Sequence, residues 1–176
     1  VYELAQKCAE KDVALLDCGV TQAVPHGLVA ILGGEAATVA DAMPVLSDFA
    51  KDVVHCGPLG AGMATKIARN IITYGTWRAV HEAATLVESA GVDPRKLITV
   101  VDDADPNGTT LFSWLRNQLG GEEEIRTMVP QVLRLMDKDL AAAQELAARS
   151  DIPVPLVDAA RANGVETLAI TEKDPS

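Results

Sequence analysis

Apolar residues change their spacing along this chain, and the change predicts two kinds of structure. In the first third, apolar runs are short and bounded by glycines, which is typical of buried strands. Three such runs lie at residues 14–17, 28–32 and 51–56. Between Glu35 and Ala50 the apolar positions recur at helical spacing, with Thr38 as a possible N-cap and Pro44 in the interior. Strand, strand, helix, strand is the order expected at the edge of an α/β sheet.

From Met63 onward the strand signals largely stop and helical spacing takes over. The first helix of this part is expected to run for about 28 residues to Ala90, with Gly91 as its C-cap and Gly75 inside it. Further helices are expected at residues 93–103, 109–119, 132–149 and 156–168, separated by breaks at 106–108, 120–121, 130 and 152–155. The pattern therefore predicts a small α/β piece followed by an all-helical domain.

Composition and charge narrow the class of protein. The 176 residues are 48% apolar, which is enough for a folded core and excludes intrinsic disorder. The net charge of −10 disfavours general nucleic-acid binding, because negative charge repels the phosphate backbone, although a small basic pocket remains possible. No stretch reaches the roughly 18 consecutive apolar residues of a membrane span, and the polar N-terminus does not follow the pattern of a signal peptide.

The cysteines and histidines predict little chemistry of their own. Three widely spaced cysteines without a C-x-x-C pair fit reduced core thiols in a cytoplasmic protein better than disulfides or a zinc site. No cluster of His, Asp or Glu has metal-ligand spacing, so no metal is expected. His55, at the end of a strand, and His81, on the long helix, are interpreted as structural. His26 lies in a loop, where solvation is favoured over contact with a substrate.

The densest candidate for chemistry follows the third predicted strand and reads GPLGAGMATKIARN from Gly57 to Asn70. A glycine-rich turn here opens a helix, and Lys66 and Asn70 lie on one face of it because they are four residues apart. The segment is not a dinucleotide-binding fingerprint, because Thr65 occupies the third glycine position and one long helix follows. Considered alone, two such polar residues are most simply explained as a solvated face.

Read with three other segments, this stretch resembles the β-hydroxyacid dehydrogenase family, which includes 3-hydroxyisobutyrate dehydrogenase and relatives of 6-phosphogluconate dehydrogenase. The other segments are DCGVTQA at 17–23, LVAILGG at 28–34 and KDLA at 138–141. The resemblance covers about residues 13–168, nearly the whole chain. It implies a mainly α fold class, in which residues 1–62 are the trailing strands of a Rossmann-like nucleotide-binding domain. Residues 63–176 would be a helical substrate and dimerisation domain, entered through a long interdomain helix.

The resemblance also implies roles for individual residues. Lys66 matches the catalytic lysine, a general acid/base, and Asn70 matches a substrate-binding asparagine. Thr21, Gln22 and Ala23 match the family's S-G-G segment, which contacts the substrate carboxylate. Gln22 and Ala23 replace both glycines, whose backbone N–H groups approach that carboxylate, so the resemblance does not determine the substrate class. Lys138 matches a lysine near cofactor and substrate, with an exposed Lys-Asp pair as the equal alternative.

The family's G-x-G-x-x-G strand–turn–helix does not occur in this sequence. We therefore expect the chain to be the C-terminal part of a longer NAD- or NADP-dependent oxidoreductase and to bind no dinucleotide productively by itself. The expected reaction is hydride transfer between a nicotinamide and a small 3-hydroxy acid or its semialdehyde, in a cytoplasmic homodimer or higher homo-oligomer. An imine reductase is a rival, which Lys66 disfavours because Asp or Tyr is expected there. A non-catalytic helical dimerisation or ligand-binding module is the alternative from another class.

Overall fold

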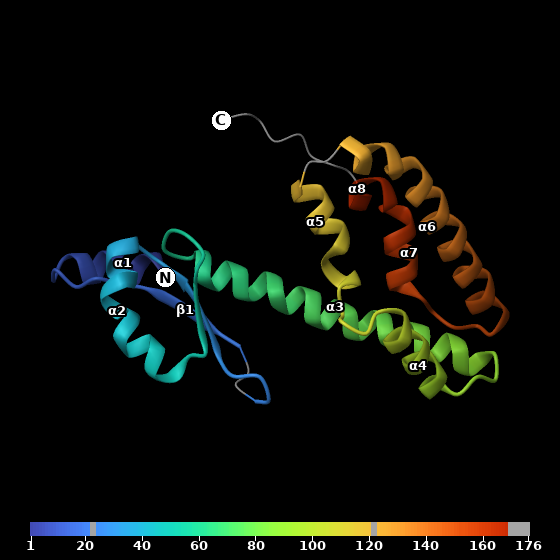
Figure 1. Ribbon diagram of the computed structural model, residues 1–176, viewed down its shortest axis with the longest axis horizontal. Helices are drawn as coiled ribbons and strands as arrows, with labels where there is room; N and C mark the ends of the chain where they lie inside the picture. The colour runs from blue at the N-terminus through green and yellow to red at the C-terminus, as the bar shows by residue number, and fades with distance from the viewer. Residues whose placement is uncertain (22–23, 121–122, 169–176) are drawn as a thin grey trace. The chain divides into compact units, whose positions relative to one another are not determined.

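The structure is a computed structural model that describes residues 1–21, 24–120 and 123–168 (Figure 1). The chain divides into two compact units, Val1–Gly75 and Thr76–Ser176. The division falls inside helix α3 (Ala61–Ser89), whose first half belongs to the first unit and whose second half belongs to the second. The domain boundary expected after residue 62, at the start of this helix, stays a prediction. The fold class is confirmed: the chain is mainly helical, with one small sheet near its N-terminus.

The sheet of the first unit contains three strands in the order β1-β2-β3. These strands are β1 (Asp17–Val20), β2 (Val29–Gly33) and β3 (Asp52–His55). β1 pairs antiparallel with β2, and β3 pairs parallel with β2. The expected first strand at 14–17 is wrong by three residues. The ladder begins only at Asp17 because its partner there, Gly33, is the last residue of β2.

Helix α2 (Ala36–Phe49) connects β2 to β3 and covers the sheet, so the two parallel strands have the crossover they need (Figure 1). The core of the unit is the cluster of Leu32, Val39 and Leu46. Thr38 is not the N-cap that its position suggested, because Glu35 occupies the cap and makes no side-chain hydrogen bond. Pro44 lies inside the helix, as expected.

Two features of the first unit were not anticipated from the sequence. Residues Tyr2–Ala9 form helix α1, which has no buried residue, and the Tyr2 hydroxyl donates to the Leu59 carbonyl over 3.4 Å. All three cysteines are free, as predicted, but they are not core residues. Cys18 is exposed because it alternates along β1 with the buried Asp17 and Gly19, and Cys8 and Cys56 are half-buried.

All the elements of the second unit that the structure describes are helices. After α3 it contains α4 (Pro94–Ala104), the short 3-10 helix η1 (Thr110–Phe112), α5 (Ser113–Gly120), α6 (Glu123–Arg149), α7 (Pro155–Ala162) and α8 (Gly164–Leu168). Helix α3 ends as predicted. Gly91 has a φ of +75°, its N–H donates to the Glu88 carbonyl, and the Val92 N–H donates to the Val87 carbonyl, which together form a Schellman motif. None of the described helices is both long and apolar enough to cross a membrane.

Pro130 is not the break that was expected, because α6 starts at Glu123 and continues through it for a total of 27 residues. A proline inside a helix removes one backbone hydrogen bond. Packing in the second unit offsets that loss, since α6 contacts both α7 and α8. At Gly164 an added Cβ would lie 3.0 Å from the Leu133 side chain, so the start of α8 approaches α6 closely.

A buried carboxylate joins α3 to α7 within the second unit. The Glu82 side chain is only 2% exposed. It accepts hydrogen bonds from Arg78 Nε at 2.7 Å and from the backbone N–H groups of Leu156 and Val157 at 3.0–3.2 Å. These N–H groups lie in the first turn of α7, where they have no partner inside the helix. Burial by itself would raise the pKa of Glu82, but the donated hydrogen bonds outweigh it and hold the pKa below its ordinary value.

Glu82→Ala is therefore expected to lower the free energy of unfolding by about 3 kcal/mol, because it leaves the N–H groups at the start of α7 without an acceptor. Glu88→Ala is the matched control on the exposed part of the same helix, with an expected change within about 0.5 kcal/mol. Urea unfolding followed by circular dichroism measures both values. Equal effects of the two substitutions would contradict the role assigned to Glu82.

The same interaction has a pH signature. Because the folded-state pKa of Glu82 lies below its ordinary value of 4.5, the carboxylate contributes its full stabilisation above about pH 4.5 and loses it as the pH falls through the folded-state pKa. The difference in unfolding free energy between the native chain and Glu82→Gln should accordingly be constant between about pH 6 and 8 and shrink in acid.

Candidate active site around Lys66

Lys66 lies on the second turn of α3, half-buried against strand β1. An added Cβ at Gly19 would lie 2.8 Å from the Lys66 Cβ, 3.2 Å from its Cγ and 3.1 Å from its Cδ. The aliphatic part of Lys66 therefore packs directly over Gly19, and only a residue without a side chain leaves room for it. This contact fixes the direction of the lysine stem relative to the sheet.

The position of Lys66 depends on how α3 begins, and a buried carboxylate determines that. Asp17, 5% exposed, accepts hydrogen bonds from the Gly60 N–H at 2.5 Å and from the Met63 N–H at 2.7 Å. These two groups lie at the start of the helix, where N–H groups have no partner within the helix and a negative charge is also favourable to the helix dipole. Asp17 thus ties the first residue of β1 to the start of the helix that carries Lys66.

Close packing fixes the same helix end against β2. An added Cβ at Gly62 would lie 2.5 Å from the Ile31 carbonyl oxygen and 2.7 Å from the Gly33 nitrogen, so the helix backbone lies directly on the strand. The preceding turn is held by His55, whose Nε2 lies 2.8 Å from the Gly34 carbonyl and 3.0 Å from the Gly57 carbonyl. Two carbonyl partners require Nε2 to carry a proton, and the structural interpretation of His55 is confirmed.

The two predicted substrate-binding residues that the structure describes lie in the same unit as Lys66. Asn70 is half-buried one helical turn further along α3, and its Oδ1 accepts a hydrogen bond from Arg69 Nη1 at 3.3 Å. Thr21 closes the β1–β2 hairpin. Its Oγ1 accepts from the Val29 N–H at 2.9 Å, and its own N–H donates to the Val29 carbonyl at 3.1 Å. Its hydroxyl proton can still be donated to a ligand. Gln22 and Ala23 lie outside the described residues.

Next to this hairpin is a pocket of about 320 Å³ with a basic lining, which the sequence had only allowed as a possibility. It is lined by Thr21, Val24, Pro25, His26, Gly27, Val29, Lys51 and Arg69. Lys51 and Arg69 were not among the residues predicted for the site. The sequence could have indicated Arg69 as a site residue, because it lies between Lys66 and Asn70 on the same helix. No local signal indicates Lys51, which reaches the pocket only because β3 pairs with β2.

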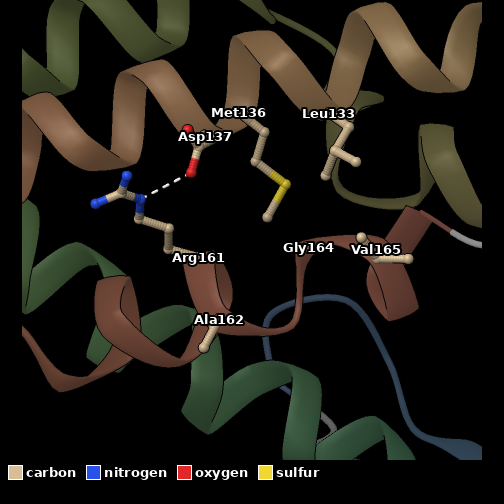
Figure 2. Close-up of a pocket in the computed structure, with 7 residues that line it drawn as sticks. All are labelled: Leu133, Met136, Asp137, Arg161, Ala162, Gly164 and Val165. Atoms are coloured by element: carbon tan, nitrogen blue, oxygen red, sulfur yellow. Dashed lines mark hydrogen bonds and ion pairs between the residues drawn. The ribbon is translucent and has the colours of Figure 1, made fainter.

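Lys138 lies in the second unit, on α6. Its side chain is 70% exposed, and its Nζ lies 3.1 Å from Asp139 Oδ1, which matches the exposed Lys-Asp pair considered above. The residue before it, Asp137, points instead into a pocket of about 230 Å³ between α6, α7 and α8, where it forms an ion pair with Arg161 at 2.8 Å (Figure 2). The cofactor role expected for Lys138 stays a prediction.

The start of α3 is not available to bind the phosphates of a dinucleotide. Its Gly60 and Met63 N–H groups already donate to Asp17, and a phosphate cradle needs such groups unoccupied. Among the residues that the structure describes, no group of three or more His, Cys, Asp or Glu side chains could hold a metal ion. The arrangement is therefore one polar helix face, with a half-buried lysine, beside a basic pocket.

Comparison with known proteins assigns this chain to a family. Residues 60–170 match the sequence profile described as "NAD-binding of NADP-dependent 3-hydroxyisobutyrate dehydrogenase". The match covers more than half of the chain and includes Lys66, Asn70 and Lys138. The chain belongs to this family of NAD(P)-dependent oxidoreductases, as the resemblance of its motifs had predicted.

Individual relatives agree with the family. An uncharacterised oxidoreductase of Synechocystis is 29% identical over 157 residues, which is 86% of this chain and 52% of that protein. The 3-hydroxyisobutyrate dehydrogenase of Pseudomonas aeruginosa is 29% identical over 171 residues, or 90% of this chain and 56% of that protein. The chain thus spans about half the length of the curated relatives it matches.

Solved structures show the same fold. A putative oxidoreductase from Mycobacterium avium superposes with a TM-score of 0.78 at 24% identity, covering 97% of this chain and 65% of that one. An imine reductase from a Pseudomonas species gives a TM-score of 0.66 at 14% identity, covering 96% of this chain and 60% of that one. At these identities the similarity is one of fold.

Replacement of the Asp17 carboxylate tests how α3 is held. Asp17→Ala is expected to lower the free energy of unfolding of the first unit by about 2 kcal/mol, because the Gly60 and Met63 N–H groups lose their acceptor. Asp52→Ala, at an exposed position in β3, is the control and should change it by less than about 0.5 kcal/mol. Hydrogen exchange at the Met63 amide should speed up in the first variant alone. Unchanged exchange there would contradict the capping role.

Proposed function

We propose that this chain is the C-terminal part of an oxidoreductase that transfers hydride between a nicotinamide cofactor and a small 3-hydroxy acid or its semialdehyde. The observation that supports this most directly is the placement of Lys66. The side chain is half-buried, its stem is held over Gly19, and its helix is anchored by Asp17. A general acid/base needs this kind of fixed position, because proton transfer requires hydrogen-bond distance to the reacting group.

In this proposal Lys66 is the one residue that accepts or donates the proton of the reaction. When an alcohol is oxidised, the carbon–hydrogen bond breaks, and the bound nicotinamide supplies the acceptor for the hydride. The hydroxyl proton must leave as the carbonyl forms, and the neutral Lys66 amine accepts it. In the reverse direction the Lys66 ammonium donates the proton to the developing alkoxide. No other group of the chain has to change its covalent bonds.

Neighbouring residues orient the substrate in this proposal. The Asn70 amide, one turn beyond Lys66 on the same face, can donate to the substrate hydroxyl or to a carboxylate oxygen without adding charge. Thr21 has a hydroxyl proton to donate. Gln22 and Ala23 are proposed to bind the substrate only on the strength of the sequence resemblance, because they lie outside the described residues. Lys138 would lie near the cofactor.

Three free cysteines are compatible with a cytoplasmic location, as proposed from the sequence.

Lys66 also separates this proposal from its closest rival. Imine reductases share the fold, but the lysine at this position favours a hydroxy acid over an imine, because an aspartate or tyrosine is expected there in the rival class. A purely structural module would not need a lysine stem packed into a gap that a glycine leaves. Hydride transfer to a hydroxy acid therefore accounts for more of the observed geometry.

Lys66→Met in the full-length protein should lower kcat about a thousandfold, because it removes the proton acceptor while keeping a similar stem length. NADH or NADPH binding, followed by fluorescence titration, should change less than about twofold, since Lys66 is not assigned to the cofactor. Lys7→Met, at an exposed position on α1, is the control. Retained turnover, or a loss of dinucleotide binding that accompanies the loss of turnover, would contradict the role of Lys66.

The protein is further proposed to form a homodimer or higher homo-oligomer through the second unit. There, α3 and α4 form an apolar groove of about 380 Å³. Val80, Ile98 and Val101 line it and are each more than half exposed. Exposed apolar surface of this kind commonly marks an interface, and a symmetric second copy would present the same face.

Ile98→Asp should convert the oligomer to a smaller species in light scattering after size exclusion, because it places a charge in the apolar contact. Lys96→Asp, an exposed charge reversal on the same helix, should leave the mass unchanged. A monomeric native protein, or an unchanged mass for Ile98→Asp, would contradict this interface.

A further inference from the structure

The basic pocket beside the β1–β2 hairpin is a concentration of positive charge on a chain whose net charge is −10. Its polar side chains are Thr21, His26, Lys51 and Arg69, and no acidic residue lines it among those the structure describes. Two permanent cations and a hydroxyl group around one cavity form a chemical environment that favours an anion.

The two cations are exposed, and no carboxylate neutralises either of them among the described residues. Lys51 packs over Gly27, where an added Cβ would lie 3.0 Å from both the Cβ and the Cδ of the lysine. Arg69 donates to the neutral Asn70 amide at 3.3 Å. Within the described part of the chain, neither Lys51 nor Arg69 forms an ion pair with a carboxylate. Their charge is therefore available to a ligand.

The pocket lies next to Lys66 along helix α3, which carries Arg69, and along strand β1, which Thr21 follows directly. Arg69 follows Lys66 by three residues, which places it about 4.5 Å further along the helix axis. Thr21 follows Gly19 by two residues, so it lies on the same face of the strand and about 6.7 Å further along. Because the Lys66 stem packs over Gly19, one side of the pocket begins roughly one helical turn beyond the catalytic lysine.

We propose that this pocket binds a second carboxylate of the substrate, remote from the reacting hydroxyl group, so that the substrate class is a hydroxy dicarboxylic acid. The proposal rests on the function proposed for Lys66, which places the reacting carbon at the lysine. The planar guanidinium of Arg69 can donate two parallel hydrogen bonds to a carboxylate, and Lys51 adds a point charge beside it. Thr21 lies at the wall of the same pocket, where its hydroxyl stays assigned to the part of the substrate nearer the reacting carbon.

Two substrates of equal chain length test this directly in the full-length protein: 3-hydroxyadipate and 3-hydroxyhexanoate, which differ only in a terminal carboxylate or methyl group. The native enzyme should favour 3-hydroxyadipate in kcat/KM. In Arg69→Gln and in Lys51→Gln the ratio of the two kcat/KM values should fall about tenfold or more, because a charged hydrogen-bond partner is lost. Lys11→Gln, which removes an exposed charge outside the pocket, should keep the native ratio.

A binding measurement separates this inference from the proposed function. Isothermal titration with adipate and with hexanoate needs no turnover. Of these two ligands only adipate should bind, and its affinity should fall in Arg69→Gln and in Lys51→Gln. Thermal melting of both variants checks that they are folded. If Lys66→Met abolishes turnover but the pocket variants keep the native substrate ratio and adipate affinity, the pocket assignment is overturned and the proposed function stands. A preference of the native enzyme for 3-hydroxyhexanoate would also overturn it.

Discussion

The hydrogen bonds from Gly60 and Met63 to the buried Asp17 carboxylate are the interaction on which the candidate site depends. They connect the first residue of β1 to the start of α3, so one charged group fixes both the strand that carries Gly19 and the helix that carries Lys66. A carboxylate at this point satisfies backbone donors that the helix itself cannot pair, and it complements the helix dipole. Because Asp17 accepts from them, the Gly60 and Met63 N–H groups position the helix and are not free for a phosphate.

The second unit also contains a buried carboxylate that accepts hydrogen bonds from the start of a helix. Glu82, buried on α3, accepts the first backbone N–H groups of α7, and Arg78 balances its charge. In both units an acidic side chain from one element therefore holds the N-terminus of a helix that is distant in sequence. Such contacts are specific, because a buried carboxylate without its donors would be costly, and they select one arrangement of elements from those that apolar packing alone would allow.

Two of the lysines in the first unit, Lys51 and Lys66, each take their position from a neighbouring glycine. Lys66 packs over Gly19 and Lys51 over Gly27, so in each case a missing side chain gives a long stem a defined position. A flexible amine gains direction when its methylene groups are held against backbone. The chain as a whole carries a net negative charge, but Lys51 and Arg69 make the lining of one pocket locally positive.

The sequence by itself determined most helices of the second unit, the Gly91 cap and the pairing of Lys66 with Asn70 on one face, because these features depend on spacing within a short segment. It predicted one helix at 156–168, where the chain forms the two helices α7 and α8. It also determined the family, through motifs kept in order along the chain. It misplaced the first strand and the end attributed to Pro130, since a strand extends only as far as its partner and packing can carry a helix past a proline. Only the tertiary structure decided that Asp17 caps α3, that Glu82 caps α7 and that Lys51 joins Arg69 at one pocket. Each of these contacts joins residues far apart in sequence, and no local pattern records which distant partner a buried charge will find.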